Sequence, residues 1–177
     1  MHPEMTAGKE PARPILIVDD EEIVLVALRD TLLREGYSVV PSPHAVHALS
    51  AIQEQEFSVV ISDQQMPMVT GLEFLGQVRQ IQPDATRILI TAVLNITTLI
   101  DAINKAEIYR FMVKPWSREE LLATVKCGVE RYERISSNSR LLARTMAQNQ
   151  QLQQANHNLE AQLARLARGE RTGKISS

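Results

Sequence analysis

The sequence feature that most constrains the fold is a repeated pairing of a short apolar segment with a helical segment. The first apolar run, PILIVD at 14–19, is typical of a strand buried on both faces, and the amphipathic stretch after it ends near Gly36. The pairing occurs five times in all. The later strand segments are 37–41, 57–62, 87–91 and 108–113, and the later helical segments are 43–55, 70–81, 96–105 and one that begins near Ser117. Strands that alternate with helices predict an α/β fold, a doubly wound five-stranded parallel sheet.

Acidic, hydroxyl and lysine side chains follow the predicted strands where each strand ends. Asp19 and Asp20 follow the first strand, Asp63 follows the third, Thr91 ends the fourth and Lys114 follows the fifth. In a doubly wound sheet these ends share one edge, where ligands bind. Taken singly, the acids could cap a helix, the threonine could be an ordinary strand residue, and the lysine before proline could mark a loop boundary. Their joint occurrence at one edge predicts a functional site.

The chemistry of these residue types points to phosphoryl transfer. Three neighbouring carboxylates repel one another unless they hold a proton or a cation. An oxygen-rich site that the protein fills only in part suits Mg²⁺, which keeps waters and accepts a phosphate oxygen. Asp63 could then attack phosphorus and form an acyl phosphate. Lys114 would neutralise the phosphoryl oxygens and Thr91 would donate a hydrogen bond to one of them.

Four motifs in this order, ILIVDDEE, VVISDQQMPMVTGLEFL, ILITA and YRFMVKPW, resemble the receiver domain of two-component response regulators. The resemblance covers roughly residues 13–130 and implies a flavodoxin-like sheet of order 2-1-3-4-5. It implies that Asp63 is the phospho-acceptor, and that Mg²⁺ is held by Asp20, Asp63 and the main-chain carbonyl of Gln65, with Asp19 assisting. It further implies a sensor histidine kinase or a phosphotransfer protein as phosphoryl donor, and a protein that catalyses only its own phosphorylation and dephosphorylation.

The same resemblance implies a conformational switch. In this family the hydroxyl at Thr91 moves toward the phosphate and lets an aromatic ring, here Phe111, turn inward, although Phe111 could also be ordinary core. The Lys114–Pro115 peptide is usually cis in the family. Gln65 and Val93 occupy positions that tune the loss of phosphate, and the apolar Val93 leads us to expect slow self-dephosphorylation.

The segment after Ser117 predicts an unusually long helix. No proline and only Gly128 interrupts helical composition before Gly169, which gives about 50 residues. Leucines recur every seven residues, as in a coiled-coil seam. The d positions include Leu152, Leu159 and Leu166 beside Asn138 and Thr145, and the a positions are Ile135, Leu142, Asn149, Asn156 and Leu163. Asparagine at a favours a parallel two-stranded register, so we expect a parallel homodimer. A helix that packs back on its own receiver, or a disordered Gln/Asn tract, remains open.

Charge and composition set further expectations. The net charge is −2, although basic residues outnumber acidic ones in 131–177. Scattered arginines are typical of a solvated helix face, so nucleic acid is not an expected partner. The single Cys127 and the lack of a signal peptide or a membrane span indicate a cytoplasmic protein. We divide the chain into a disordered leader (1–12), a receiver domain (13–130), a coiled-coil helix (131–168) and a disordered tail (169–177).

Together these features predict a response regulator that takes a phosphoryl group on Asp63 with Mg²⁺ and signals through a conformational switch and a dimeric coil. The alternative is a transcriptional or RNA regulator that binds nucleic acid through the mildly basic coil. A phosphatase-like enzyme would use the same aspartate chemistry, but no substrate pocket is indicated. The sequence identifies neither the cognate kinase nor the downstream target.

Overall fold

The structure, a computed structural model, describes residues 12–92, 100 and 106–172, with side chains described as far as 168. Five parallel strands form one sheet in the order β2-β1-β3-β4-β5. The strands are β1 (Ile15–Val18), β2 (Val39–Ser42), β3 (Val59–Asp63), β4 (Thr86–Thr91) and β5 (Arg110–Val113). The predicted fold class and strand order are therefore confirmed.

Helices alternate with the strands as predicted. They are α1 (Glu22–Arg34), α2 (Ala45–Glu54), α3 (Gly71–Ile81) and α5 (Arg118–Thr172). The helix predicted at 96–105 falls almost wholly outside the described residues, as do most of the predicted leader and the end of the predicted tail. β2 begins two residues later than its apolar pattern suggested, and α5 continues through Gly169.

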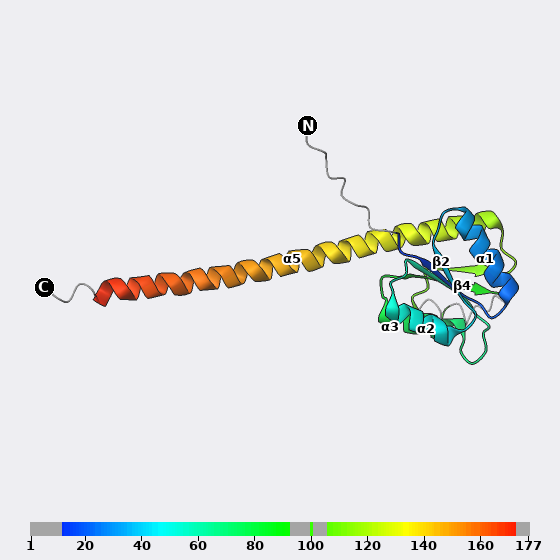
Figure 1. Ribbon diagram of the computed structural model, residues 1–177, viewed down its shortest axis with the longest axis horizontal. Helices are drawn as coiled ribbons and strands as arrows, with labels where there is room; N and C mark the ends of the chain where they lie inside the picture. Colours follow the sequence, from blue (N-terminus) through cyan, green and yellow to red (C-terminus); the bar gives the residue numbers. More distant parts are fainter. Residues whose placement is uncertain (1–11, 93–99, 101–105, 173–177) are drawn as a thin grey trace, which may run out of the picture. The chain divides into compact units, whose positions relative to one another are not determined.

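The alternation of side chains along each strand divides the interior into two cores, one on each face of the sheet. Helices α2 and α3 cover one face, and α1 with the start of α5 covers the other (Figure 1). Strand residues of the first core include Leu16, Val18, Val60 and Leu89, and those of the second include Ile15, Ile17, Val59, Ile61, Ile88 and Ile90. Because β1, β3 and β4 are buried on both faces, their sequences read as continuous apolar runs rather than as alternating ones.

Local signals fix where helices begin and end. The Thr70 hydroxyl accepts the N–H of Glu73, and the Glu73 carboxylate accepts the N–H of Thr70, so α3 begins with a capping box that the sequence analysis missed. The Ser117 hydroxyl accepts the N–H of Glu120 and caps the start of α5, which the sequence predicted near Ser117. Gly36, with φ of 84°, adopts the left-handed conformation after α1.

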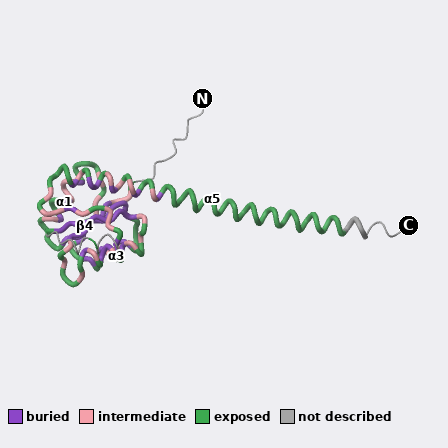
Figure 2. The backbone as a smooth tube through the Cα atoms, turned by 180° about the vertical axis from the view of Figure 1, so that it is seen from behind, coloured by how far each residue is buried: buried purple, intermediate pink, exposed green. Residues whose placement is uncertain are grey.

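The chain divides into two compact units, Met1–Ile135 and Ser136–Ser177, although α5 is a continuous helix. In the first unit α5 contributes buried side chains such as Leu121 and Val125 to the core. In the second unit every residue from 137 to 168 is exposed (Figure 2). Within the described part of the chain, no helix combines the length and apolarity needed to cross a bilayer.

Candidate functional site

The predicted acids lie at the carboxyl edge of the sheet because β1 and β3 are adjacent parallel strands. Asp63 is the last residue of β3, and Asp19 follows β1 directly. Both are buried, with 5% of Asp63 and 1% of Asp19 exposed. Lys114 follows β5, and its peptide bond to Pro115 is cis, as the resemblance implied. Strand order therefore places residues from three strands at one end of the sheet.

Lys114 joins the acids across this edge. Its Nζ lies 2.8 Å from Oδ1 of Asp63, 3.1 Å from Oδ2 of Asp19 and 3.2 Å from Oε1 of Glu21. Glu21 is an additional member of the site, and its place as the third acid of the run that begins at Asp19 is the sequence signal that could have identified it. The lysine ammonium is thus the common partner of three carboxylates.

Burial and charge act in opposite directions on these groups. Burial raises the pKa of the Asp19 carboxyl above its usual value, against the lowering effect of hydrogen bonds from the Glu21 N–H and Lys114. For Lys114, burial would lower the pKa, but hydrogen bonds to Asp63 and Asp19 and the charges of both acids outweigh it and raise the pKa. We conclude that Lys114 is a firmly protonated ammonium beside two buried acids.

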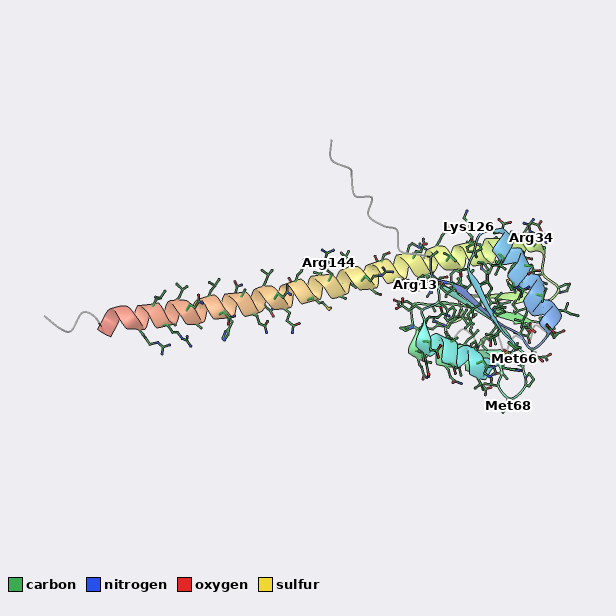
Figure 3. All side chains as sticks on the ribbon, viewed as in Figure 1. Arg13, Arg34, Met66, Met68, Lys126 and Arg144 are labelled. Carbon is green, nitrogen blue, oxygen red and sulfur yellow. The ribbon has the colours of Figure 1, made fainter. Side chains whose placement is uncertain are left out.

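The main chain after β3 also bears on Asp63. Oδ2 of Asp63 accepts the N–H of Gln65 at 2.6 Å, so one carboxylate oxygen contacts the lysine and the other contacts the backbone. Met66 and Met68 lie on the same loop (Figure 3), and Met68 is fully exposed with φ of 72°. This loop carries a backbone donor to the side chain that the sequence assigns as phospho-acceptor.

Thr91 and Phe111, the two predicted switch residues, lie on neighbouring strands. Thr91 is the buried last residue of β4, and it pairs with Val113 of β5. Phe111 lies two residues before Val113 and packs, partly buried, against the core on the side of α2 and α3. Val93 lies outside the described residues, so the structure adds nothing on the predicted role of that position in phosphate loss.

The fit of Mg²⁺ depends on the oxygen donors at this edge. Among the described residues, no group of three acidic, histidine or cysteine side chains is already arranged around one point, and Asp20 and Gln65 are exposed. The donor set nevertheless suits the ion, because Asp19 and Asp63 are two buried carboxylates and the partly buried Lys114 is the cation that contacts both. Mg²⁺ commonly binds through one or two carboxylates and keeps several waters. These residues therefore fit a magnesium ion.

A five-stranded sheet of this order, with buried aspartates and a lysine at its carboxyl edge, defines a receiver domain. The sequence profile of the response regulator receiver domain family matches residues 15–126. The chain belongs to that family, which is not one of conventional enzymes. The resemblance seen in the four motifs is thereby confirmed.

Two curated relatives are transcriptional regulators. The hydrogenase transcriptional regulatory protein HoxA of Cupriavidus necator is 39% identical over 116 residues, which are 66% of this chain and 24% of HoxA. The alginate biosynthesis transcriptional regulatory protein AlgB of Pseudomonas syringae is 37% identical over 123 residues, 69% of this chain and 27% of AlgB. The chain thus spans about a quarter of the length of these relatives.

Two solved structures resemble the receiver part. The signal receiver domain of an HD domain-containing protein from Pseudomonas fluorescens is 31% identical with a TM-score of 0.70, covering 75% of this chain and 98% of that one. The beryllofluoride-activated NtrC4 receiver domain dimer is 34% identical with a TM-score of 0.64, covering 67% of this chain and 98% of that one.

Proposed function

We propose that this chain is the response regulator of a two-component phosphorelay and that Asp63 accepts a phosphoryl group from a sensor histidine kinase or a phosphotransfer protein. The observation that carries the proposal is the contact between Lys114 Nζ and Asp63 Oδ1 at 2.8 Å, inside a site built from three strands. A buried aspartate held against an ammonium is poised for chemistry in which charge neutralisation is most of the catalysis. We also propose that the protein is cytoplasmic.

Each residue has its own part in the transfer. A carboxylate oxygen of Asp63 attacks phosphorus, so that one O–P bond forms while the bond between phosphorus and the donor breaks. Lys114 neutralises charge on the phosphoryl oxygens, and the Thr91 hydroxyl donates a hydrogen bond to one of them. Mg²⁺, held by Asp19, Asp20, Asp63 and the Gln65 carbonyl, would supply further neutralising charge. The chain's own residues thus orient the acceptor and stabilise the transferred group.

The conformational response runs along β4 and β5. When Thr91 moves toward the phosphoryl group, it vacates space near the first core, and Phe111 can turn inward. Phe111 is only partly buried and Thr91 is buried, which is the arrangement that this exchange requires. The change is a shift between two populations that exist before phosphorylation.

The second unit is proposed to form a parallel homodimer. The seam leucines at 142, 152, 159, 163 and 166 are between 56% and 67% exposed in the single chain. An apolar stripe of this length on a helix gains free energy when a second helix covers it. Asn149 and Asn156 at a positions favour two parallel, in-register helices. The similar NtrC4 structure is a dimer of receiver domains, which supports dimerisation of this chain without bearing on the helix itself.

A second candidate output is nucleic-acid binding through the basic coil. It is favoured by the names of HoxA and AlgB, although this chain covers only about a quarter of each. Filter binding of duplex DNA and of RNA tests it, since a phosphate-dominated contact weakens steeply with salt. Binding that is absent at low salt would remove this candidate.

The phosphoryl-acceptor proposal is tested by intact mass spectrometry after incubation with Mg²⁺ and acetyl phosphate. We expect a single phosphate adduct on the native chain and none on Asp63→Asn, a nearly isosteric variant that cannot form the acyl phosphate. The same reaction with excess EDTA should give no adduct. An adduct that persists in Asp63→Asn, or the absence of an adduct on the native chain, would contradict the assignment of Asp63 as phospho-acceptor.

A further inference from the structure

We propose that Glu21 is a positioning residue that holds the Lys114 ammonium at the rim of the site and competes for it with a phosphoryl group on Asp63. The inference rests on the proposed function and concerns how readily that function proceeds. It assigns a role to an acid that neither the sequence analysis nor the family match had placed in the site.

Lys114 has one carboxylate partner for each of its N–H donors. An ammonium has three N–H donors, and Lys114 has three carboxylate partners within 3.2 Å: Asp63, Asp19 and Glu21. Every donor can therefore be engaged before any phosphoryl group arrives. A new contact to a phosphoryl oxygen has to replace or share one of these three.

The second support is the difference in exposure among the partners. The side chains of Asp19 and Asp63 are 1% and 7% exposed, whereas that of Glu21 is 64% exposed. Solvent screens an exposed ion pair and leaves a buried one strong. The contact with Glu21 is therefore the weakest of the three and the first to be exchanged.

The third support is the local structure that aims Glu21 at the lysine. Glu21 is the N-cap residue of α1, yet its side chain makes no capping hydrogen bond. Its N–H is held by Oδ1 of Asp19 at 2.9 Å, and its carbonyl accepts the N–H groups of Val24 and Leu25. The backbone is thus fixed against the site, while the side chain remains available to Lys114.

These observations predict that Glu21 modestly slows phosphorylation of Asp63. In the unphosphorylated receiver Glu21 shares Lys114 with the two buried acids. During transfer the ammonium is needed by the phosphoryl oxygens, so the contact with Glu21 opposes the reaction. Because the pair is exposed, its removal should change the rate by about two- to fivefold.

The test compares Glu21→Gln with Glu22→Gln. Glu22 is the adjoining exposed acid in the first turn of α1 and is not one of the three partners of Lys114. Both variants remove one negative charge near the site, so their difference reports the contact. At saturating Mg²⁺ and with acetyl phosphate, E21Q should take up phosphate about two- to fivefold faster than E22Q. Glu21→Asp, which keeps the charge but is shorter by one methylene, should fall between wild type and E21Q.

Two further readouts separate a contact with Lys114 from a change of fold. The advantage of E21Q should shrink as salt rises from 0.05 to about 1 M, because exposed pairs are screened. The Lys114 Cε resonance in the unphosphorylated protein should shift in E21Q and stay in place in E22Q. Equal rates for E21Q and E22Q, a slower E21Q, an advantage unchanged by salt, or an unmoved resonance would overturn the inference. If wild type takes up no phosphate, the proposed function itself fails.

Discussion

Gly71 lies so close to Asp63 that no side chain fits between them. A Cβ built on Gly71 would lie 2.1 Å from the carbonyl oxygen of Asp63 and 2.9 Å from Cδ1 of Leu89. The Gly71 N–H donates to the carbonyl of Gln64 at 3.0 Å, which fixes the approach. The first residue of α3 is therefore packed directly against the backbone of the proposed phospho-acceptor.

Gly71→Ala is expected to lower both stability and phosphorylation. The added methyl group must push the Asp63 backbone or α3 aside, at a cost of about 1–3 kcal/mol in the free energy of unfolding. Gly76→Ala is the control, since a Cβ there meets nothing within 4 Å in the same helix. It should raise the free energy of unfolding by about 0.5–1 kcal/mol, because alanine favours the helical conformation more than glycine does. Urea unfolding of both variants checks this, and equal effects would contradict the close packing.

Thr86 ties β4 to α5 through a buried hydroxyl. The hydroxyl donates to the carbonyl of Gly128 at 2.7 Å and accepts a hydrogen bond from Arg131 at 3.4 Å. Thr86→Val keeps the shape of the side chain but leaves the Gly128 carbonyl and the Arg131 N–H without this partner. The free energy of unfolding should therefore fall by about 1–2 kcal/mol. Thr31→Val is the matched control, because its hydroxyl also donates to a helix carbonyl at 2.7 Å, but in a hydrogen bond that is exposed to solvent. Urea unfolding measures both variants, and an equal loss of unfolding free energy in Thr31→Val would refute the role of burial.

The capping box of α3 should be sensitive to acid. The N–H and hydroxyl of Thr70 donate to Glu73, and they lower the pKa of the Glu73 carboxyl below its usual 4.5. An acid with a lowered folded-state pKa contributes stability above its unfolded pKa and loses it as pH falls through the folded value. In an NMR titration the Glu73 carboxyl should have its midpoint below 4.5, and Thr70→Ala should move that midpoint upward. A Glu73 midpoint that is unchanged in Thr70→Ala would argue against the capping box.

The coil should depend on its d positions. Substitution of Leu152 and Leu159 by serine removes two apolar layers from the seam and is expected to turn the dimer into a monomer. Ala161→Ser, an exposed helical position outside the a and d positions, should leave the association unchanged. Sedimentation equilibrium measures both. A wild-type chain that stays monomeric at high concentration would contradict the dimer.

The sequence predicted most of the fold because each buried strand carries its own apolar run and each strand end its own polar residue. Strand order alone places Asp19, Asp63 and Lys114 at one edge of the sheet. In the structure the carboxylates of both aspartates lie within 3.1 Å of the lysine Nζ. Glu21 was missed because periodicity says where a residue falls along a helix, not where a flexible side chain reaches. The bounds of β2 were displaced because it is a short edge strand with a weak pattern.

We propose that Asp63, and neither Asp19 nor Asp20, takes the phosphoryl group. Treatment of the phosphorylated chain with borohydride reduces an acyl phosphate to the alcohol, so the modified aspartate becomes homoserine and can be located by peptide sequencing in a mass spectrometer. We expect homoserine at position 63 after incubation with Mg²⁺ and acetyl phosphate, with Asp19 and Asp20 intact. Homoserine at position 19 or 20, or at none of the three, would contradict it.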